Sequence, residues 1–240
     1  MNRIGFDRKC SNCTLSCGSA VTGQSEVPMS DVVLIVVSAY PGSNEIKKNM
    51  SLVGNKDNTT AGAFLRLSLN LFFEEKFPNS TFEKYVYFTN AIKCTPQRKN
   101  QSIKITPAHL KSCRMWLNLE LAALPKCPIL IASSEASNSL LNMKLGVARN
   151  KIHTIEGRKA VATYNPIEWE RGALKKVANL EKTESDLKLV LEKTSDPKNL
   201  GKLIKPVFWK PAPYGSTLWF VHRDLTKIKS LVMEYMGNDV

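Results

Sequence analysis

The chain has 240 residues, enough to bury a sizeable core as one large domain or as one domain with an appendage. Lysine and arginine number 34 against 21 acidic residues, and the resulting net charge of +13 favours a polyanion such as nucleic acid as partner. No apolar run approaches the roughly 20 residues that cross a bilayer, and residues 1–8 lack the apolar core of a secretion signal. We therefore expect a cytoplasmic protein without a membrane segment.

Apolar strand-like segments alternate with segments of helical spacing along the chain. The expected strands are residues 32–37, 84–88, 128–132 and 159–164. The expected helices are residues 60–69, one from Thr106-Pro107 onward, one from Ser133 onward and a charged one at about 185–193. This alternation favours a three-layer αβα sandwich around a mostly parallel four-stranded sheet.

The texture of the sequence changes after Asp196-Pro197. Residues 205–211 and 216–221 have the aromatic content of two strands, and residues 224–236 have the pattern of an amphipathic helix. We expect residues 1–196 to form an α/β domain and residues 197–240 a C-terminal β/α extension packed on it. The alternative is that this extension is a docking element for a protein partner.

The cysteines of a cytoplasmic chain indicate metal ligands rather than a disulfide framework. Four of the six supply enough thiolates for a tetrahedral zinc ion or a four-iron cluster, and thiolates alone do not choose between the two. These four are Cys10, Cys13, Cys94 and Cys113. Cys17 is a spare that could replace one ligand, whereas Cys127, just before a strand, is expected to be a small buried hydrophobe.

The strand at 84–88 runs into Thr89-Asn90, four residues before Cys94. An open α/β sheet presents side chains to a ligand at its carboxyl edge, so Asn90 is the main candidate for a pocket residue. The alternative interpretation is that Asn90 only closes a turn.

Several motifs together carry a resemblance to a known family. They are Cys10-x-x-Cys13-x-Leu15, Ser38-Ala39-Tyr40-Pro41-Gly42, Val53-Gly54 with Ala61-Gly62, Thr89-Asn90-Ala91-Ile92-Lys93-Cys94, Cys113-x-x-Trp116-Leu117, Thr163-Tyr164-Asn165-Pro166 and Arg171. Over about residues 10–192 the chain resembles the uracil-DNA glycosylase superfamily, specifically its family 4 branch, which carries a four-iron cluster. The resemblance implies a cluster at the four cysteines named above, with zinc as the second candidate.

The resemblance also implies roles at the pocket. A glycosylase flips its base out of the stack and reads its Watson–Crick edge, and the Asn90 amide offers both a donor and an acceptor for that purpose. Asn165 is expected to donate a hydrogen bond to the departing base, unless it only caps a turn.

The chain departs from the family pattern at four pocket positions. Ala39 stands where the family has a glutamate, Asn165 where it has a histidine and Leu52 where it has the phenylalanine that stacks on uracil. Tyr40 is bulkier than the family's alanine. These changes indicate a uracil pocket that has been rebuilt or retired.

Two hypotheses follow. The first is a DNA glycosylase for a base other than plain uracil, such as a bulkier modified pyrimidine of viral DNA, with the attacking water placed by Asn44, Glu45 or Asp57. Glu45 is the leading candidate because it matches an acidic position of the family segment, and its alternative is a solvated loop acid. The second is a catalytically inactive DNA-binding or replication accessory protein that uses residues 197–240 as its partner site.

Either hypothesis requires contacts with DNA. Arg171 matches an arginine in the family's DNA-inserting loop, and Trp169 beside it is the candidate for an apolar wedge. Lys93 and Arg98, which follow the central strand, are expected to add cationic contacts. We expect the protein to act as a monomer on DNA.

Overall fold

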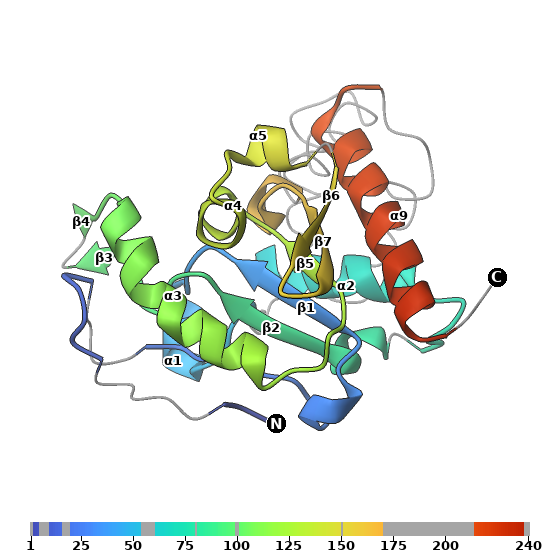
Figure 1. Cartoon of the computed structure of the whole chain (residues 1–240), viewed down its shortest axis with the longest axis horizontal. Helices are drawn as coiled ribbons and strands as arrows, with labels where there is room; N and C mark the ends of the chain where they lie inside the picture. Colours follow the sequence, from blue (N-terminus) through green and yellow to red (C-terminus); the bar gives the residue numbers. More distant parts are fainter. Residues whose placement is uncertain are drawn as a thin grey trace, which may run out of the picture.

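A five-stranded sheet forms the middle layer of the computed structural model (Figure 1), in the order β2-β1-β5-β7-β6. The strands are β1 (Leu34–Ser38), β2 (Val86–Asn90), β5 (Ile129–Ile131), β6 (Ile152–Ile155) and β7 (Arg158–Ala162). The pairs β1–β2, β1–β5 and β5–β7 are parallel, and β6 is antiparallel to β7. The structure describes residues 2–4, 10–15, 20–53, 61–79, 81–98, 101–149, 151–169 and 214–237.

Helices cover both faces of the sheet, which makes three layers. On one face α2 (Ala61–Phe72) and α9 (Thr217–Tyr235) pack against Leu34, Val36 and Phe88. On the other face α3 (Pro107–Ala122), α4 (Ser134–Leu141) and α5 (Leu145–Ala148) pack against Ile35, Val37 and other residues. Alternate residues of β1 thus enter opposite cores, as expected for a strand that is covered on both sides. The αβα sandwich predicted from the sequence is confirmed.

The shorter elements connect these layers. They are the 3-10 helices η1 (Met29–Asp31) and η2 (Phe82–Tyr85), the helix α1 (Ser43–Lys48), and a two-stranded antiparallel ribbon of β3 (Gln97–Arg98) and β4 (Gln101–Ser102). Among the described residues, no helix combines the length and the apolar character that crossing a membrane requires.

The fifth strand, β6, was not predicted. It joins β7 through a two-residue turn at Glu156 and Gly157, whose φ angles are 49° and 81°. Two positive φ angles in succession are typical of the tight hairpin turn that matches strand twist, and glycine favours that conformation. Gly157 was the signal available in the sequence, whereas the residues of β6 show no apolar alternation, since Ile152 is exposed and His153 is buried.

The C-terminal part differs from its prediction. The expected strand at 216–221 is wrong, because Ser216 caps a helix there: its Oγ accepts a hydrogen bond from the Trp219 N–H at 3.2 Å. Leu218, Val221 and Leu225 then follow the helical repeat and enter the core. The helix predicted at 224–236 therefore begins earlier, at Thr217. The expected strand at 205–211 and the helix at 185–193 lie outside the described residues.

The strands bring the motifs to one edge of the sheet. Ser38 is the register partner of Asn90, and beyond the strands the Ala91 N–H donates to Ser38 O at 2.8 Å and the Ile92 N–H to Ala39 O at 2.9 Å. Because β5 and β7 are parallel to β1, Ser133 and Asn165 follow at the same carboxyl edge. In an open α/β sheet this edge is the usual place for a ligand.

Candidate active site at the carboxyl edge of the sheet

Asn90 ends β2 and is completely buried. Its Nδ2 lies 3.2 Å from Ser51 Oγ, whereas its Oδ1 accepts no hydrogen bond from any described residue. A buried acceptor without a partner is costly and uncommon in a folded protein. The amide nitrogen is thus held by Ser51, and the amide oxygen is available to accept a hydrogen bond.

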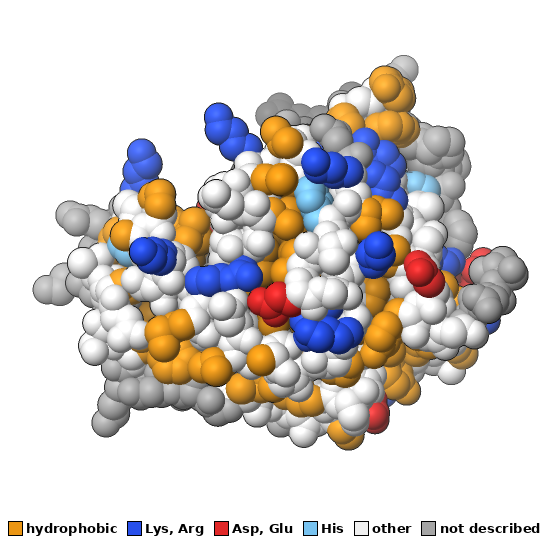
Figure 2. Space-filling view, viewed as in Figure 1, with side chains coloured by type: hydrophobic (Ala, Val, Ile, Leu, Met, Phe, Trp, Pro, Cys, Tyr) orange, Lys and Arg blue, Asp and Glu red, His pale blue; other side chains and the backbone are white. Residues whose placement is uncertain are grey.

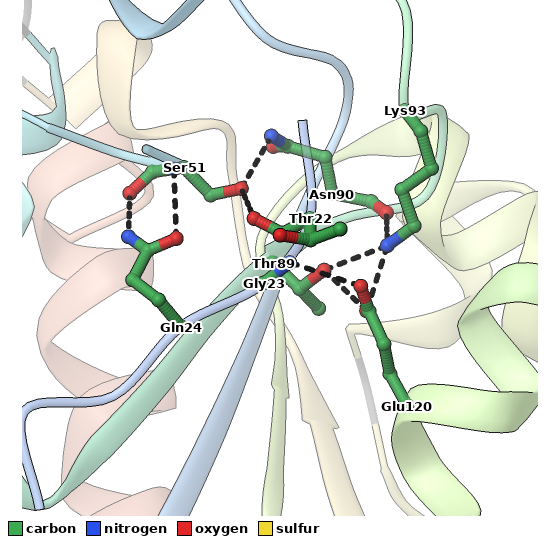
Figure 3. A network of polar contacts seen from close by, with 8 residues as sticks. All are labelled: Thr22, Gly23, Gln24, Ser51, Thr89, Asn90, Lys93 and Glu120. Carbon is green, nitrogen blue, oxygen red and sulfur yellow. Dashed lines mark hydrogen bonds and ion pairs between the residues drawn. The ribbon is translucent and has the colours of Figure 1, made fainter. Parts of the chain in front are cut away.

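Ser51 is held by a residue that sequence reasoning missed, Gln24 (Figure 3). The Gln24 Nε2 donates to Ser51 O at 2.7 Å, and the Ser51 N–H donates to Gln24 Oε1 at 3.0 Å. The backbone of Gln24 in turn exchanges two hydrogen bonds with Phe88 in β2. The pair is 27 residues apart in the chain, and no local motif signals it.

A buried polar network lies next to Asn90 on the α3 side (Figure 3). Lys93 Nζ donates to Asn90 O, to Thr89 Oγ1 and to Glu120 Oε2, each at 2.7 Å. The Thr89 hydroxyl donates to Glu120 Oε2 at 2.6 Å, and the Gly23 N–H donates to Glu120 Oε1 at 2.9 Å. The Lys93 ammonium group and both oxygens of the Glu120 carboxylate have hydrogen-bond partners, so the network holds the end of β2 in place.

This network corrects the prediction that Lys93 contacts DNA. Its side chain is only 1% exposed and forms an ion pair with Glu120. Arg98 lies on β3, and its side chain is outside the described part of the structure.

Leu52, at the position of the family's stacking phenylalanine, is held in an unusual backbone conformation. Its φ is +50°, and its carbonyl accepts a hydrogen bond from Arg66 Nε at 2.9 Å. Gly62 allows α2 to approach it closely, since a Cβ there would lie 2.6 Å from the Leu52 carbonyl carbon. The Leu52 side chain is buried and belongs to the core on the α2 side.

Glu45 completes the support of Leu52. One carboxylate oxygen accepts a hydrogen bond from the Leu52 N–H, and the other accepts from the Gly42 N–H at 2.6 Å. Burial raises the pKa of this carboxyl, although the two backbone N–H groups and the charge of Arg66 act in the opposite direction. The alternative of a solvated loop acid is therefore wrong, because this carboxylate braces the loop backbone.

The other residues predicted around the first motif lie as follows. Ala39 is buried and carries no carboxylate, and Tyr40 is 40% exposed, with its pKa raised by burial and by the charge of Glu135. Asn44 is half-buried on α1, and Asp57 lies outside the described residues.

Asn165 follows β7 and is half-buried. Its Oδ1 accepts a hydrogen bond from the Ile167 N–H at 3.2 Å, and its carbonyl accepts from the Glu168 N–H at 2.8 Å. The side chain thus does cap a turn. Because the Asn165 oxygen is used in the cap, its amide nitrogen is the atom that can donate a hydrogen bond to a ligand.

Trp169 does not provide the predicted wedge. Its side chain is completely buried in the α2-side core, and its Nε1 donates to Tyr164 O at 2.8 Å. Arg171 lies outside the described residues.

The site can now be compared with known proteins. The sequence model of the Uracil DNA glycosylase superfamily matches residues 25–188. The chain belongs to this superfamily. Its members act on DNA and hydrolyse N-glycosidic bonds, and the matched region contains Asn90, Leu52 and Asn165. No curated protein matches the chain.

In this superfamily member, three of the four predicted cysteine ligands, Cys13, Cys94 and Cys113, lie in one small cluster beside α3. Cys94 and Cys113 are buried in a small apolar cluster on which Cys13 packs. Burial raises the pKa of the Cys113 thiol, the Lys93 backbone N–H donates to it, and charges on Cys13 and Cys10 would raise it further. Among the described residues no group of three or more side chains is arranged as a metal site. Thiolates are the donors that zinc and iron–sulfur clusters take, so the type of side chain fits such a group, but the described arrangement does not by itself form a metal site.

Two further observations concern the cysteines. The Cys-bearing segment is tied to α3 by His109, whose Nδ1 accepts from the Thr106 N–H at 3.1 Å while its Nε2 lies 2.9 Å from Thr14 Oγ1. Cys127 is buried beneath α3, and burial raises its pKa to about 12. The interpretation of Cys127 as a small buried hydrophobe is therefore confirmed, and Cys17 lies outside the described residues.

A groove of about 700 Å³ lies between α3 and α4 and begins at the carboxyl edge, near Thr106 and Ser134. Lys111 is exposed in this groove, whereas Arg114 donates a hydrogen bond from Nη1 to Ser139 O at 2.8 Å. Figure 2 shows lysine and arginine side chains spread over this face of the molecule, with few acidic ones between them. The groove carries Lys111 and Arg114 together with the acidic Glu135, and its lining does not include Asn90, Ser51 or Asn165.

Proposed function

We propose that the protein is a DNA glycosylase that removes a base other than plain uracil, a bulkier modified pyrimidine being our leading candidate. The observation that carries this proposal is the buried Asn90 amide at the carboxyl edge of a superfamily fold, with its oxygen unmatched by any described residue. A flipped base would supply the missing donor.

The reaction places definite demands on the site. The bond between the sugar C1′ and the base nitrogen breaks, and the electron pair leaves with the base. A water oxygen bonds to C1′ and loses a proton, which ends on the departed base anion. Negative charge develops on the departing base, and a hydrogen-bond donor facing it lowers the barrier. The Asn165 amide nitrogen is our candidate donor, since its oxygen is already used in the turn.

Two residues argue against plain uracil as the substrate, since Leu52 has no ring to stack on a flat pyrimidine and Tyr40 changes the shape of the first motif. Ala39 has no carboxylate to place the water, which affects hydrolysis of any base. Glu45 is the nearest acid in that motif, but both its oxygens already accept backbone N–H groups. The first role of Glu45 is to hold the backbone of Leu52. Only the second lone pair of a carboxylate oxygen remains to accept a hydrogen bond from a water molecule.

We also propose that Cys10, Cys13, Cys94 and Cys113 hold a four-iron cluster. The support is the packing of Cys13, Cys94 and Cys113 in one cluster together with the family-like spacing of the four cysteines. Such a group would act structurally, by joining the N-terminal segment to the end of β2 and to α3. Zinc is the alternative occupant of the same thiolates.

A binding module without catalysis is the second candidate function. Both residues that would replace the family's glutamate and histidine already make structural contacts. Glu45 accepts hydrogen bonds from two backbone amides, and Asn165 caps a turn. In this alternative the fold would hold DNA, or a replication or repair protein through residues 197–240, without breaking the glycosidic bond.

The experiment is a release assay on duplex and single-stranded oligonucleotides that contain uracil, hypoxanthine or 5-substituted pyrimidines. Abasic sites are detected by alkaline cleavage, and Asn90→Ala is the matched control. We expect abasic sites at a 5-substituted pyrimidine, fewer at uracil, and almost none with Asn90→Ala. Equal cleavage of uracil would contradict the substrate proposal, and no cleavage of any base would favour the binding module.

A further inference from the structure

The Ser51 hydroxyl has a single proton and two polar neighbours among the residues that the structure describes (Figure 3). Its Oγ lies 3.2 Å from Thr22 O and 3.2 Å from the Asn90 side-chain amide. A backbone carbonyl only accepts hydrogen bonds, so the hydroxyl proton goes to Thr22. Ser51 Oγ is then left as an acceptor toward Asn90.

This assignment determines which way the Asn90 amide points. With Nδ2 toward Ser51, a donor meets the hydroxyl lone pair. The reverse orientation would place Oδ1 against Ser51 Oγ, so that two acceptors would face each other in a buried site. Because two acceptors that face each other in a buried site leave both unmatched, the first orientation dominates.

The hydroxyl is itself held rigidly. The side-chain amide of Gln24 holds the backbone of Ser51 through both its nitrogen and its oxygen, and the backbone of Gln24 pairs with Phe88, two residues before Asn90 in β2. The positions of Ser51 and Asn90 are thus both fixed by β2, the first through Gln24 and the second directly. A side chain whose partners are fixed in this way is oriented before the ligand arrives.

We propose that Ser51 is a positioning residue that presents the Asn90 oxygen to the base, so that the site selects bases that donate an N–H. The proposal rests on the proposed function of the pocket, and it adds Ser51 as the residue that sets the direction of the Asn90 amide. A pyrimidine with an imide N–H, such as a 5-substituted uracil, satisfies the requirement. A base methylated at that nitrogen leaves the oxygen unmatched.

Asn90 is completely buried, so the residues that cover it must move when a base enters. Ser51 is tied through Gln24 to β2, so the proposal requires that the covering residues move while Ser51 and Gln24 keep these contacts.

The test uses free uracil and 3-methyluracil as probes and the side-chain amide NMR signals of Asn90 as the readout. We compare wild type with Ser51→Ala, which removes the hydroxyl, and Ser51→Thr, which keeps it. Wild type and Ser51→Thr should prefer uracil over 3-methyluracil by about tenfold or more, as expected for one lost hydrogen bond. Ser51→Ala should lose most of this preference, because its Asn90 amide can turn. Thermal unfolding of the three proteins checks that each is folded.

The outcomes separate this inference from the proposed function. If Ser51→Ala keeps the full preference, or if wild type shows none, the positioning role is overturned even if the protein cleaves DNA. If the preference follows the hydroxyl while no oligonucleotide is cleaved, the positioning role stands and the glycosylase proposal fails. A merely structural role for Ser51 would weaken both probes equally and would also overturn the inference.

Discussion

Lys93 and Glu120 form a buried ion pair beside the candidate base-reading residue, with Lys93 Nζ 2.7 Å from Glu120 Oε2. The same ammonium group donates to the Asn90 carbonyl. The end of β2 is therefore anchored to α3, from which Glu120 projects. In this superfamily member the strand end that carries Asn90 is positioned by charge as well as by the sheet.

Breaking this pair from one side should be far worse than removing both charges. Lys93→Met leaves the Glu120 carboxylate buried and unpaired, and we expect it to lower the free energy of unfolding by about 3–5 kcal/mol. Lys93→Met combined with Glu120→Gln leaves no uncompensated charge and should lose much less. Urea unfolding of the two proteins measures the difference. A single variant as stable as the double one would contradict this account of the network.

Gly62 should be required for the placement of Leu52. A methyl group at residue 62 would lie 2.6 Å from the Leu52 carbonyl carbon, so Gly62→Ala must displace one of the two backbones. We expect a loss of about 1–3 kcal/mol, typical of overpacking. Gly146→Ala is the matched control, because a Cβ there meets nothing within 4 Å and alanine favours the helix. If chemical denaturation shows the two variants to be equally stable, Gly62 has no such role.

Local sequence signals predicted the framework, and long-range contacts decided the rest. The run Val32–Val37 and the pair Thr106-Pro107 predicted a covered strand and a helix start because each depends on neighbouring residues alone. Lys93 was assigned to DNA because lysines are mostly exposed, and its burial depends on Glu120, 27 residues away. Gln24 was missed for the same reason, since its partner Ser51 is equally distant.

The candidate site was predicted in part. Asn90 was expected at a strand end, and its place at the end of β2 follows from that local pattern. Its unmatched oxygen depends on the orientation of Ser51, which no spacing in the sequence encodes. The aromatic side chain of Trp169 suggested a wedge, but the adjacent turn directs it into the core.

Glu45 should make stability depend on pH in a definite direction. Burial raises its pKa above the usual value of 4.5, so the folded protein holds this proton more firmly than the unfolded chain does. The contribution of this group is therefore fully present below pH 4.5 and is lost as the pH rises through the raised pKa. We expect the stability advantage of wild type over Glu45→Gln to shrink as the pH rises from 4 to 7 in urea unfolding, as the linkage relation requires. An advantage that grows over this interval would mean that the carboxylate is stabilised when ionised.

The cysteines offer a matched pair of variants. Cys94→Ser removes a proposed cluster ligand, whereas Cys127→Ser changes a thiol buried elsewhere in the core. Wild type purified under anaerobic, iron-replete conditions should be brown and contain iron and sulfide, and Cys94→Ser should lose both. Cys127→Ser should keep the colour and iron content while losing some stability. A colourless wild type with one equivalent of zinc would instead assign the thiolates to zinc.

Lys111 should contribute a phosphate contact that Lys126 does not. Lys111 lines the groove that begins at the carboxyl edge, where the candidate active site lies, and its side chain is exposed. Lys126 is also exposed but precedes β5, at the opposite edge of the sheet, where its Nζ donates to Glu156 O at 2.9 Å.

Each phosphate contact on duplex DNA adds about 0.9 to the slope of log affinity against log salt. We expect Lys111→Ala to reduce this slope by about that amount, and Lys126→Ala to leave it nearly unchanged even though both variants lower the net charge equally. Affinities measured by fluorescence anisotropy over a series of salt concentrations test this. Equal slopes for the two variants would mean that DNA responds to the overall charge of the protein and does not enter the groove.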